Sequence, residues 1–126
     1  MPSDKTKAAA FQDFMTSFGL PAYAATAVPD DATEPYITYT LATGMWGDGE
    51  QACDLSIWYR TTSEAKPNAK AREIGEALGI GGTCLPCDEG LVWVKRGQPF
   101  SQPVDSGDNA VKRRYINLSV EFLTTY

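Results

Sequence analysis

The first hydrophobic pattern along the chain has the period of a helix. Residues 4–18 carry large apolar side chains at positions i, i+3, i+4 and i+7, which together form one face of a helix. We expect Ser3 to cap the start of this helix, and Gly19 with Pro21 to end it. Such a face is typical of a helix packed on a sheet and is seldom a cofactor site. Its members are Phe11, Phe14, Met15 and Phe18.

Two later segments alternate between apolar and polar residues, as a strand with one buried face does. The first covers residues 36–42 (YITYTLA) and the second covers residues 51–61 (QACDLSIWYRT). The connection between them, residues 43–50 (TGMWGDGE), contains three glycines and predicts the tip of a hairpin. Cys53 lies on the apolar side of the second strand, so we expect it to be a small buried hydrophobe. Residues 20–34, with two prolines and an acidic turn, predict a linker.

A second helical pattern begins at Ser63 or Lys66, with Pro67 tolerated in its first turn. The glycines of residues 79–82 (GIGG) end this helix, so we interpret them as a helix C-terminus. A phosphate-binding loop has the opposite arrangement, because it leads into the N-terminus of a helix. The apolar stripe of the second helix consists of Ala71, Ile74, Ala77 and Leu78.

The C-terminal part of the chain predicts strands. Residues 90–97 (GLVWVKRG) form a short strand, and residues 98–104 form an edge segment at best because they contain two prolines. After a turn at residues 105–109, a long final strand alternates between apolar and polar residues. The order of elements predicts an α+β fold: an antiparallel sheet of four to five strands with two helices packed on one face. The apolar side of the final strand consists of Ile116, Leu118, Val120 and Phe122.

Length and composition predict a single domain, residues 1–126, because a chain of this size with 43% hydrophobic residues can bury its own core. No apolar run approaches the length of a membrane span, and the first residues lack the apolar stretch of a signal peptide. We therefore expect neither membrane association nor export. The net charge of −5 disfavours nonspecific binding to duplex DNA.

The charge is unevenly distributed along the chain. Residues 1–59 carry two basic and eight acidic residues, whereas residues 60–126 carry nine basic and eight acidic residues. This asymmetry is consistent with head-to-tail stacking of copies of the protein. It is equally consistent with uneven solvation of one chain, and the sequence leaves both interpretations open.

Cys84 and Cys87, in the segment GGTCLPC (residues 81–87), have the spacing of a redox dithiol or of half a zinc site. A catalytic dithiol lies at the N-terminus of a helix that follows a strand, whereas this pair follows a helix and precedes a strand. A structural zinc site needs four ligands, and the chain contains no histidine. We interpret the pair as a proline-containing turn whose thiols oxidise adventitiously or bridge to a neighbouring copy. A small CxxC thiol or metal module is the alternative.

The absence of histidine also removes the Ser-His and Cys-His nucleophilic schemes and histidine acid–base chemistry. The remaining candidates are carboxylates in predicted turns, where acidic residues are common. We therefore expect no enzyme activity, no cofactor and no metal. These carboxylates belong to Asp30, Asp31, Glu34, Asp88 and Glu89.

Two tryptophans have no obvious place in the predicted core. Met45 and Trp46 stand at the hairpin tip, and an exposed tryptophan in such a place often marks an interface. The alternative is that the Trp46 ring folds back on its own sheet. Trp58 lies on the side of its strand that faces away from Leu55 and Ile57, which suggests that a second subunit covers that side.

Five of the eleven basic residues flank residues 97–111, near the ends of predicted strands. This placement allows them to come together in space and to contact acidic groups of a partner, or phosphate. Taken alone, the residues slightly favour the other interpretation, that of solvated strand ends. The five residues are Lys95, Arg96, Lys112, Arg113 and Arg114.

Taken together, these segments resemble the small tail-terminator (tail-completion) proteins of long-tailed bacteriophages and prophages. The resemblance spans about residues 8–126 and rests on the order and character of the elements. They are the N-terminal helix, the strand PYITYTL, the glycine- and acid-containing turn, the segment DLSIWYRTTSEA that leads into the second helix, and the closing strand RRYINLSVEFLTTY.

The resemblance implies a structural virion protein without catalytic residues, assembled in the host cytoplasm. Such a protein forms a ring, usually a hexamer, at the head-proximal end of the tail tube. The ring stops polymerisation of the tail-tube protein and offers a surface to the head-completion or connector protein. Another head–tail connector or a tail-tube subunit is the alternative within the same class.

A heterologous ring needs two complementary faces on each protomer. The acidic first half of the chain and the basic residues of the second half would supply them. DNA passes through such a ring without specific binding, so an acidic lumen is expected because it repels phosphate. We place Asp48 and Glu50 near that lumen or at the subunit contact.

Overall fold

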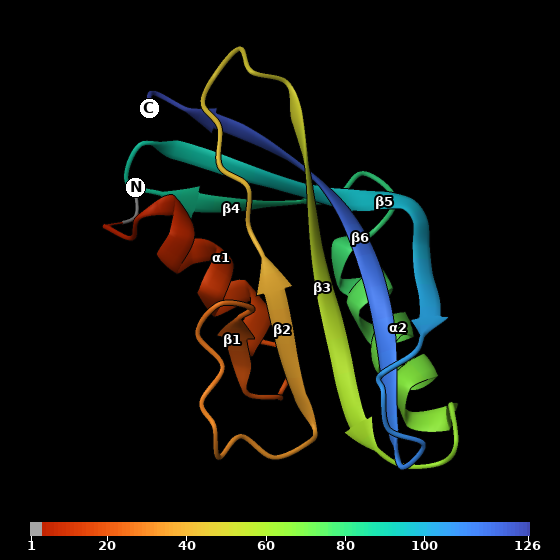
Figure 1. The fold of residues 1–126 in the computed structure, drawn as a ribbon. Coiled ribbons are helices and arrows are strands. Elements are labelled where there is room, and N and C mark those ends of the chain that lie inside the picture. Colours follow the sequence, from red (N-terminus) through yellow and green to blue (C-terminus); the bar gives the residue numbers. More distant parts are fainter. Residues whose placement is uncertain (1–3) are drawn as a thin grey trace.

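The structure is a computed structural model that describes residues 4–126, and in it two helices pack on one six-stranded sheet (Figure 1). In chain order the elements are α1 (Lys7–Thr16), β1 (Ala22–Ala24), β2 (Tyr36–Thr40), β3 (Glu50–Arg60), α2 (Ala65–Leu78), β4 (Thr83–Cys87), β5 (Gly90–Val104) and β6 (Val111–Thr124).

The strands follow the order β1-β2-β3-β6-β5-β4 across the sheet. β1 runs parallel to β2, and every other neighbouring pair is antiparallel. The α+β class is as predicted, but the sheet is larger than the expected four to five strands and contains one parallel pair. β1 and β4 are the strands that the hydrophobic pattern did not reveal.

β1 lies inside the segment predicted to be a linker, residues 20–34. Backbone hydrogen bonds fix both of its ends against β2. The amide of Ile37 donates to the carbonyl of Pro21 at 2.8 Å, and the amide of Ala25 donates to the carbonyl of Tyr39 at 2.8 Å. A strand of three residues is too short to show a period in the sequence, which is why the pattern missed it.

The segment that was predicted to be a cysteine-containing turn is strand β4. It forms a hairpin with β5, in which Cys87 pairs with Gly90 across a two-residue connection. Gly90 has φ of +142°, and a Cβ at this position would lie 2.1 Å from the carbonyl oxygen of Leu123 on β6. Only glycine fits there, so this residue allows the hairpin to lie flat against β6.

Both helices begin and end close to the predicted positions. Thr6 caps α1, because its side-chain oxygen accepts a hydrogen bond from the amide of Ala9 at 3.1 Å. The expected cap, Ser3, lies outside the described residues. α2 ends at Gly79 with φ of +73°, as the glycine pattern predicted.

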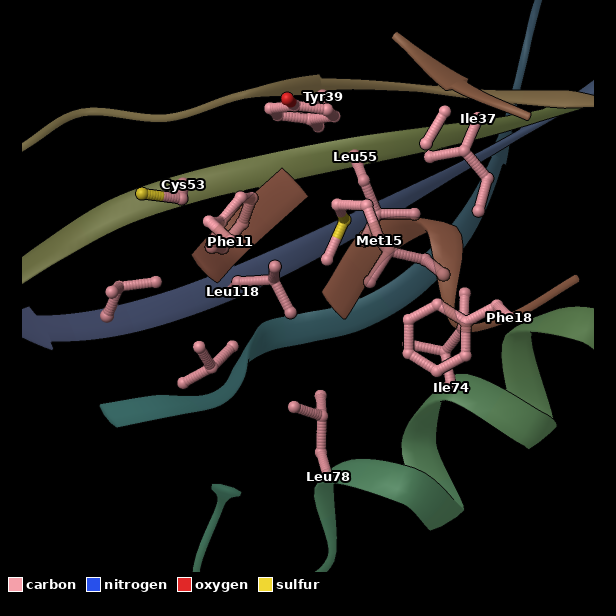
Figure 2. Close-up of a cluster of buried hydrophobic side chains, with 14 of the residues drawn as sticks. Phe11, Met15, Phe18, Ile37, Tyr39, Cys53, Leu55, Ile74, Leu78 and Leu118 are labelled. Atoms are coloured by element: carbon pink, nitrogen blue, oxygen red, sulfur yellow. The ribbon is translucent and has the colours of Figure 1, made fainter. Parts of the chain in front are cut away.

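The two helices cover the same face of the sheet and share one core with it (Figure 2). Phe11 and Met15 of α1 and Ile74 of α2 are fully buried, and Figure 2 shows them with Leu55 and Leu118 of the central strands. Cys53 is buried in the same cluster as predicted, and burial raises the pKa of its thiol. The prediction of two helices on one face is therefore confirmed.

β5 is longer than expected because residues 98–104 continue it. An irregularity in the pairing with β6 falls between Arg96 and Ser101, and Pro99 lies within it. β4 pairs only with residues 90–94, so the second half of β5 is an edge of the sheet. An edge strand tolerates proline, as the sequence predicted for this segment.

The opposite face of the sheet carries no helix in the described part of the chain. Its strands present alternating side chains that are mostly polar or aromatic and partly exposed. Several of the residues that the sequence singled out lie on this open face or at its end.

Candidate assembly surface

The connection between β2 and β3 presents Trp46 to solvent. Hereafter residues 43–49 are called the Trp46 turn. Its backbone is closed by two hydrogen bonds: the amide of Met45 donates to Asp48 Oδ2 at 2.9 Å, and the amide of Asp48 donates to the Met45 carbonyl at 3.0 Å. The amide of Trp46 donates to the Thr124 carbonyl at 2.9 Å, which attaches the turn to the end of β6.

A lysine on α1 holds the same turn from the other side. Lys7 Nζ donates to the Gly44 carbonyl at 2.7 Å and to the Tyr126 carbonyl at 2.6 Å. The same ammonium lies 5.4 Å from the centre of the Phe122 ring and 5.5 Å from that of Tyr126. The Trp46 turn is therefore tied to α1 and to the C-terminal end of β6.

Trp46 remains largely uncovered by its own fold, because the residue is 69% exposed, and Met45 is 45% exposed. The ring does not fold back on its own sheet, which was the alternative considered from the sequence. A fixed turn that exposes a large aromatic ring has the character of a preorganised contact.

Asp48 and Glu50 have different environments. Asp48 closes the Trp46 turn, as described above. Glu50, the first residue of β3, forms an ion pair with Lys95 of β5, and Lys95 also approaches Glu121 of β6 at 3.6 Å. The hydrogen bond from Lys95 and one from Ser119 lower the pKa of Glu50 below its ordinary value.

An aromatic row crosses the open face from β1 to β6. Tyr23 lies edge-on to Tyr36 at 5.9 Å between ring centres, and Tyr36 stacks on Trp58 at 6.1 Å. The guanidinium of Arg113 lies 4.8 Å from the centre of the Trp58 ring. Trp58 Nε1 donates to Thr38 Oγ1 at 2.9 Å, so the indole is held by its own sheet. Tyr36 and Arg113 of the same chain thus cover part of the Trp58 ring, which was expected to be covered by a second subunit.

The five basic residues do not form the single cluster that their placement in the sequence allowed. Lys95 pairs across the sheet with Ser119, which lies six residues from Arg113 along β6, or about 20 Å at the rise of a strand. Lys112 lies at the far end of the sheet, paired in register with Tyr59 of β3. Neighbouring residues of a strand also point to opposite faces, which separates each pair of consecutive cations.

Two of these cations fix α2 on the sheet. Arg96 donates to the carbonyl of Gly75 at 2.6 Å. Arg114 is buried, donates to Glu64 at 3.1 Å and also bonds to Asn68 near the start of the helix. Both are therefore structural residues of this protomer, in addition to any role at a partner.

Cys84 and Cys87 lie on β4 with different environments: Cys84 is exposed and Cys87 is buried, and both thiols are free. Residues three apart on a strand point to opposite faces and are about 10 Å apart between Cα atoms, beyond the reach of a disulfide. Within residues 4–126, no group of three or more histidine, cysteine, aspartate or glutamate side chains is arranged to hold a metal ion.

The structure also contains a hollow that was not predicted from the sequence. It has a volume of about 320 Å³ and lies between α2 and the second half of β5; hereafter it is called the α2–β5 pocket. One signal was present in the sequence, since a glycine inside a helix often marks close packing. That residue is Gly75, where a Cβ would lie 3.1 Å from Cε2 of Phe100.

No helix in residues 4–126 has the length and apolar character needed to cross a bilayer. No family model matches this sequence, and no curated protein does. Among solved structures, the fold is similar to that of a chain from the "Virion of native gene transfer agent (GTA) particle". The two share 16% sequence identity with a TM-score of 0.60, over 90% of this chain and 90% of that chain. At this identity the likeness shows a common fold.

Proposed function

We propose that this protein is a structural component of a phage-like virion and that it forms a ring at the head-proximal end of the tail tube. The observation that carries the proposal is the fold, which is shared over 90% of both chains with a chain of a gene transfer agent virion. The resemblance of the sequence to tail-terminator proteins narrows the virion role to the end of the tail. There the ring would stop polymerisation of the tail-tube protein and bind the head-completion or connector protein.

Features of the surface support assembly with other copies. A closed ring of identical subunits needs a contact between two different faces of each protomer. The Trp46 turn is a candidate for one of these faces, because it exposes two large apolar residues, Met45 at 45% and Trp46 at 69%. Exposed tryptophan on a fixed backbone is the type of residue that carries binding energy at interfaces.

The electrostatics suit a ring through which DNA passes without being held. The net charge is −5, and two of the cations that could contact phosphate are paired with carboxylates within the protomer. Lys95 is paired with Glu50, and Arg114 is paired with Glu64. We propose that Asp48 and Glu50 lie near the lumen or at the subunit contact.

The proposal includes no catalytic activity, cofactor or metal. The alternatives are a tail-tube subunit or another head–tail connector, each of which would also assemble from copies of one chain. A tail-tube subunit would differ from a terminator because it grows into filaments instead of stopping at a closed ring. The thiol or metal module has no supporting observation, because Cys84 and Cys87 cannot share a ligand in strand β4 without rebuilding it.

The decisive experiment adds the purified protein to polymerising tail-tube protein of the same virus and images the products by electron microscopy. A terminator is expected to form a discrete ring on one end of each tube and to shorten the tubes as its concentration rises. Filaments built from the protein alone would instead identify a tube subunit. Tubes of unchanged length with bare ends would contradict the proposal.

A further inference from the structure

Trp46 exposes a large apolar surface on a fixed backbone. Its backbone amide donates to the Thr124 carbonyl at 2.9 Å, but the residue is 69% exposed. Residues 43–49 are fixed by Asp48 and by Lys7, so little conformational entropy remains to be lost when the ring is buried. A surface of this kind behaves as a rigid projection with an acidic residue, Asp48, beside it.

The α2–β5 pocket has the complementary character. The apolar part of its lining consists of Ala71, Gly75 and Phe100, and Asn68 and Ser101 also line it. At about 320 Å³ it is at the small end of the range for ligand sites, a size suited to one aromatic side chain. Arg72 and Arg96 stand at its rim, and Arg96 lies with its guanidinium 5.6 Å from the centre of the Phe100 ring.

Charge selects this pocket over the two other apolar hollows. One of these is lined by residues around Tyr39 and Leu41, carries no charged side chain and adjoins the Trp46 turn itself. The other contains Lys5 and Asp13, which form an ion pair with each other. The α2–β5 pocket has a cationic excess, since its two arginines face only one carboxylate.

That carboxylate is Glu76, which pairs with Arg72 at 3.0 Å across one turn of α2. Arg96 donates to the Gly75 carbonyl at 2.6 Å. Because a carbonyl is uncharged, this hydrogen bond does not neutralise the positive charge of the guanidinium. A carboxylate brought to the rim by a partner would therefore be attracted to Arg96. Asp48 is positioned to be that carboxylate when Trp46 enters the pocket.

The turn and the pocket occupy different parts of the molecule. Figure 1 shows the β2–β3 connection at one end of the sheet, beyond the tips of the strands, whereas α2 and the second half of β5 lie toward the other end. The turn therefore cannot contact the pocket of its own protomer. A contact between the turn of one protomer and the pocket of another joins two different surfaces and is heterologous. Heterologous contacts generate closed rings when the rotation between subunits closes.

We propose that Trp46 of one copy inserts into the α2–β5 pocket of the next copy, with Asp48 facing Arg96 at the rim. This inference rests on the proposed ring, for which it supplies the contact between neighbouring subunits. The partner is thus a second copy of this chain. Ser101 lines the pocket and marks the place where a larger side chain would close it.

Two variants test the two halves of the contact separately. Trp46→Ala removes the projecting ring and leaves the pocket open, whereas Ser101→Tyr fills the pocket and leaves the ring. Ile80→Ser is the matched control, because Ile80 is fully exposed at 101% and takes no part in the contact. Self-association of each protein is measured by light scattering and analytical ultracentrifugation up to millimolar concentration, with thermal unfolding to verify the fold.

We expect each of the first two variants to weaken self-association by at least about 30-fold, and the control to leave it unchanged. An equimolar mixture of Trp46→Ala and Ser101→Tyr proteins is expected to form a one-to-one dimer and nothing larger. Only one productive contact is possible in that mixture: the ring of one variant in the pocket of the other. Formation of this dimer also shows that both variants are folded.

Wild-type rings that persist unchanged in the Trp46→Ala variant would overturn this contact and leave the proposed ring standing. A wild-type protein that remains monomeric at every concentration would also overturn the contact as proposed. Capping of tail tubes is the independent readout of the ring proposal, and bare tubes would reject that proposal whatever the fate of Trp46.

Discussion

The guanidinium of Arg113 lies 4.8 Å from the centre of the Trp58 ring, on the face of the sheet that no helix within residues 4–126 covers. The two residues belong to paired positions of β6 and β3 and end an aromatic row that begins at Tyr23. Arg113 Nε also donates to Ser56 Oγ at 3.0 Å. The side chains of this aromatic row on the open face are therefore held in place by contacts within the chain.

A double-mutant cycle measures the contribution of this stacked pair to stability. We expect Trp58→Leu and Arg113→Gln to be coupled by about 0.5–1 kcal/mol, because a cation over an exposed ring contributes that much. The measurement is urea denaturation of the wild type, both single variants and the double variant. Additive effects, with no coupling beyond error, would show that the pair is adjacent without interacting.

Arg114 is expected to be the most sensitive of the basic residues. Arg114→Ala should lower the free energy of unfolding by about 2 kcal/mol, since it breaks hydrogen bonds from a buried guanidinium to Glu64 and Asn68. The matched control is Arg72→Ala, whose side chain is 82% exposed and forms a surface pair with Glu76. That change should stay within about 0.5 kcal/mol. Equal effects in the two variants would contradict the role assigned to Arg114 in fixing α2.

Gly90→Ala should be far more damaging than the same change at another glycine with positive φ. A Cβ at Gly90 would lie 2.1 Å from the Leu123 carbonyl oxygen, so the β4–β5 hairpin would have to move. We expect a loss of about 3 kcal/mol or more, measured by denaturation. Gly107 is the control, because its φ is +86° but no atom lies within 4 Å of an added Cβ. There the expected loss is about 1 kcal/mol.

The pKa of Glu50 reports its ion pair with Lys95. In the folded protein this pKa is lower than the ordinary value of 4.5, chiefly because Lys95 donates a hydrogen bond to the carboxylate. The pair therefore stabilises the fold above the unfolded-state pKa, and this stabilisation is lost as the pH falls through the folded-state pKa. Lys95→Gln should raise the pKa toward 4.5, as measured by NMR titration of the Glu50 carboxyl. An unchanged titration curve would show that Lys95 does not act on Glu50 in solution.

The three cysteines should differ in their reaction with a thiol reagent. In the native protein we expect Cys84 to react rapidly, because it is exposed, while Cys53 and Cys87 react only on unfolding. Oxidation should produce no Cys84–Cys87 disulfide within one chain, as judged by mass spectrometry of peptides. Fast modification of all three thiols, or stoichiometric uptake of zinc, would restore the thiol module as a candidate.

Periodicity predicted the elements that are long enough to show it. The apolar stripe around Phe11 and the alternation around Leu118 identified α1 and β6 because each spans several repeats of its period. β1 has three residues and leaves no such signal. β4 was obscured by Pro86, since proline in a short segment normally indicates a turn, and here it is tolerated on an edge strand.

The candidate surface was predicted in part. Trp46 was singled out as a candidate interface residue because a side chain at a glycine-rich hairpin tip has no core to pack into. The structure shows that this residue is exposed. The basic residues were grouped by their proximity in sequence, but the alternation of a strand sends Lys95 and Arg96 to opposite faces. The α2–β5 pocket depends on how Phe100 of an edge strand meets Gly75 of a helix, a tertiary contact that no local pattern encodes.

The attachment of Lys7 to the carbonyls of Gly44 and Tyr126 has a practical consequence for the design of expression vectors. It gathers the start of α1, the C-terminal residue and the Trp46 turn at one end of the sheet (Figure 1). An affinity tag fused directly to Tyr126 would emerge beside Trp46 and compete with any subunit that docks there. A tag inserted in the exposed turn around Asn109, between β5 and β6, would leave that end of the molecule clear for assembly assays.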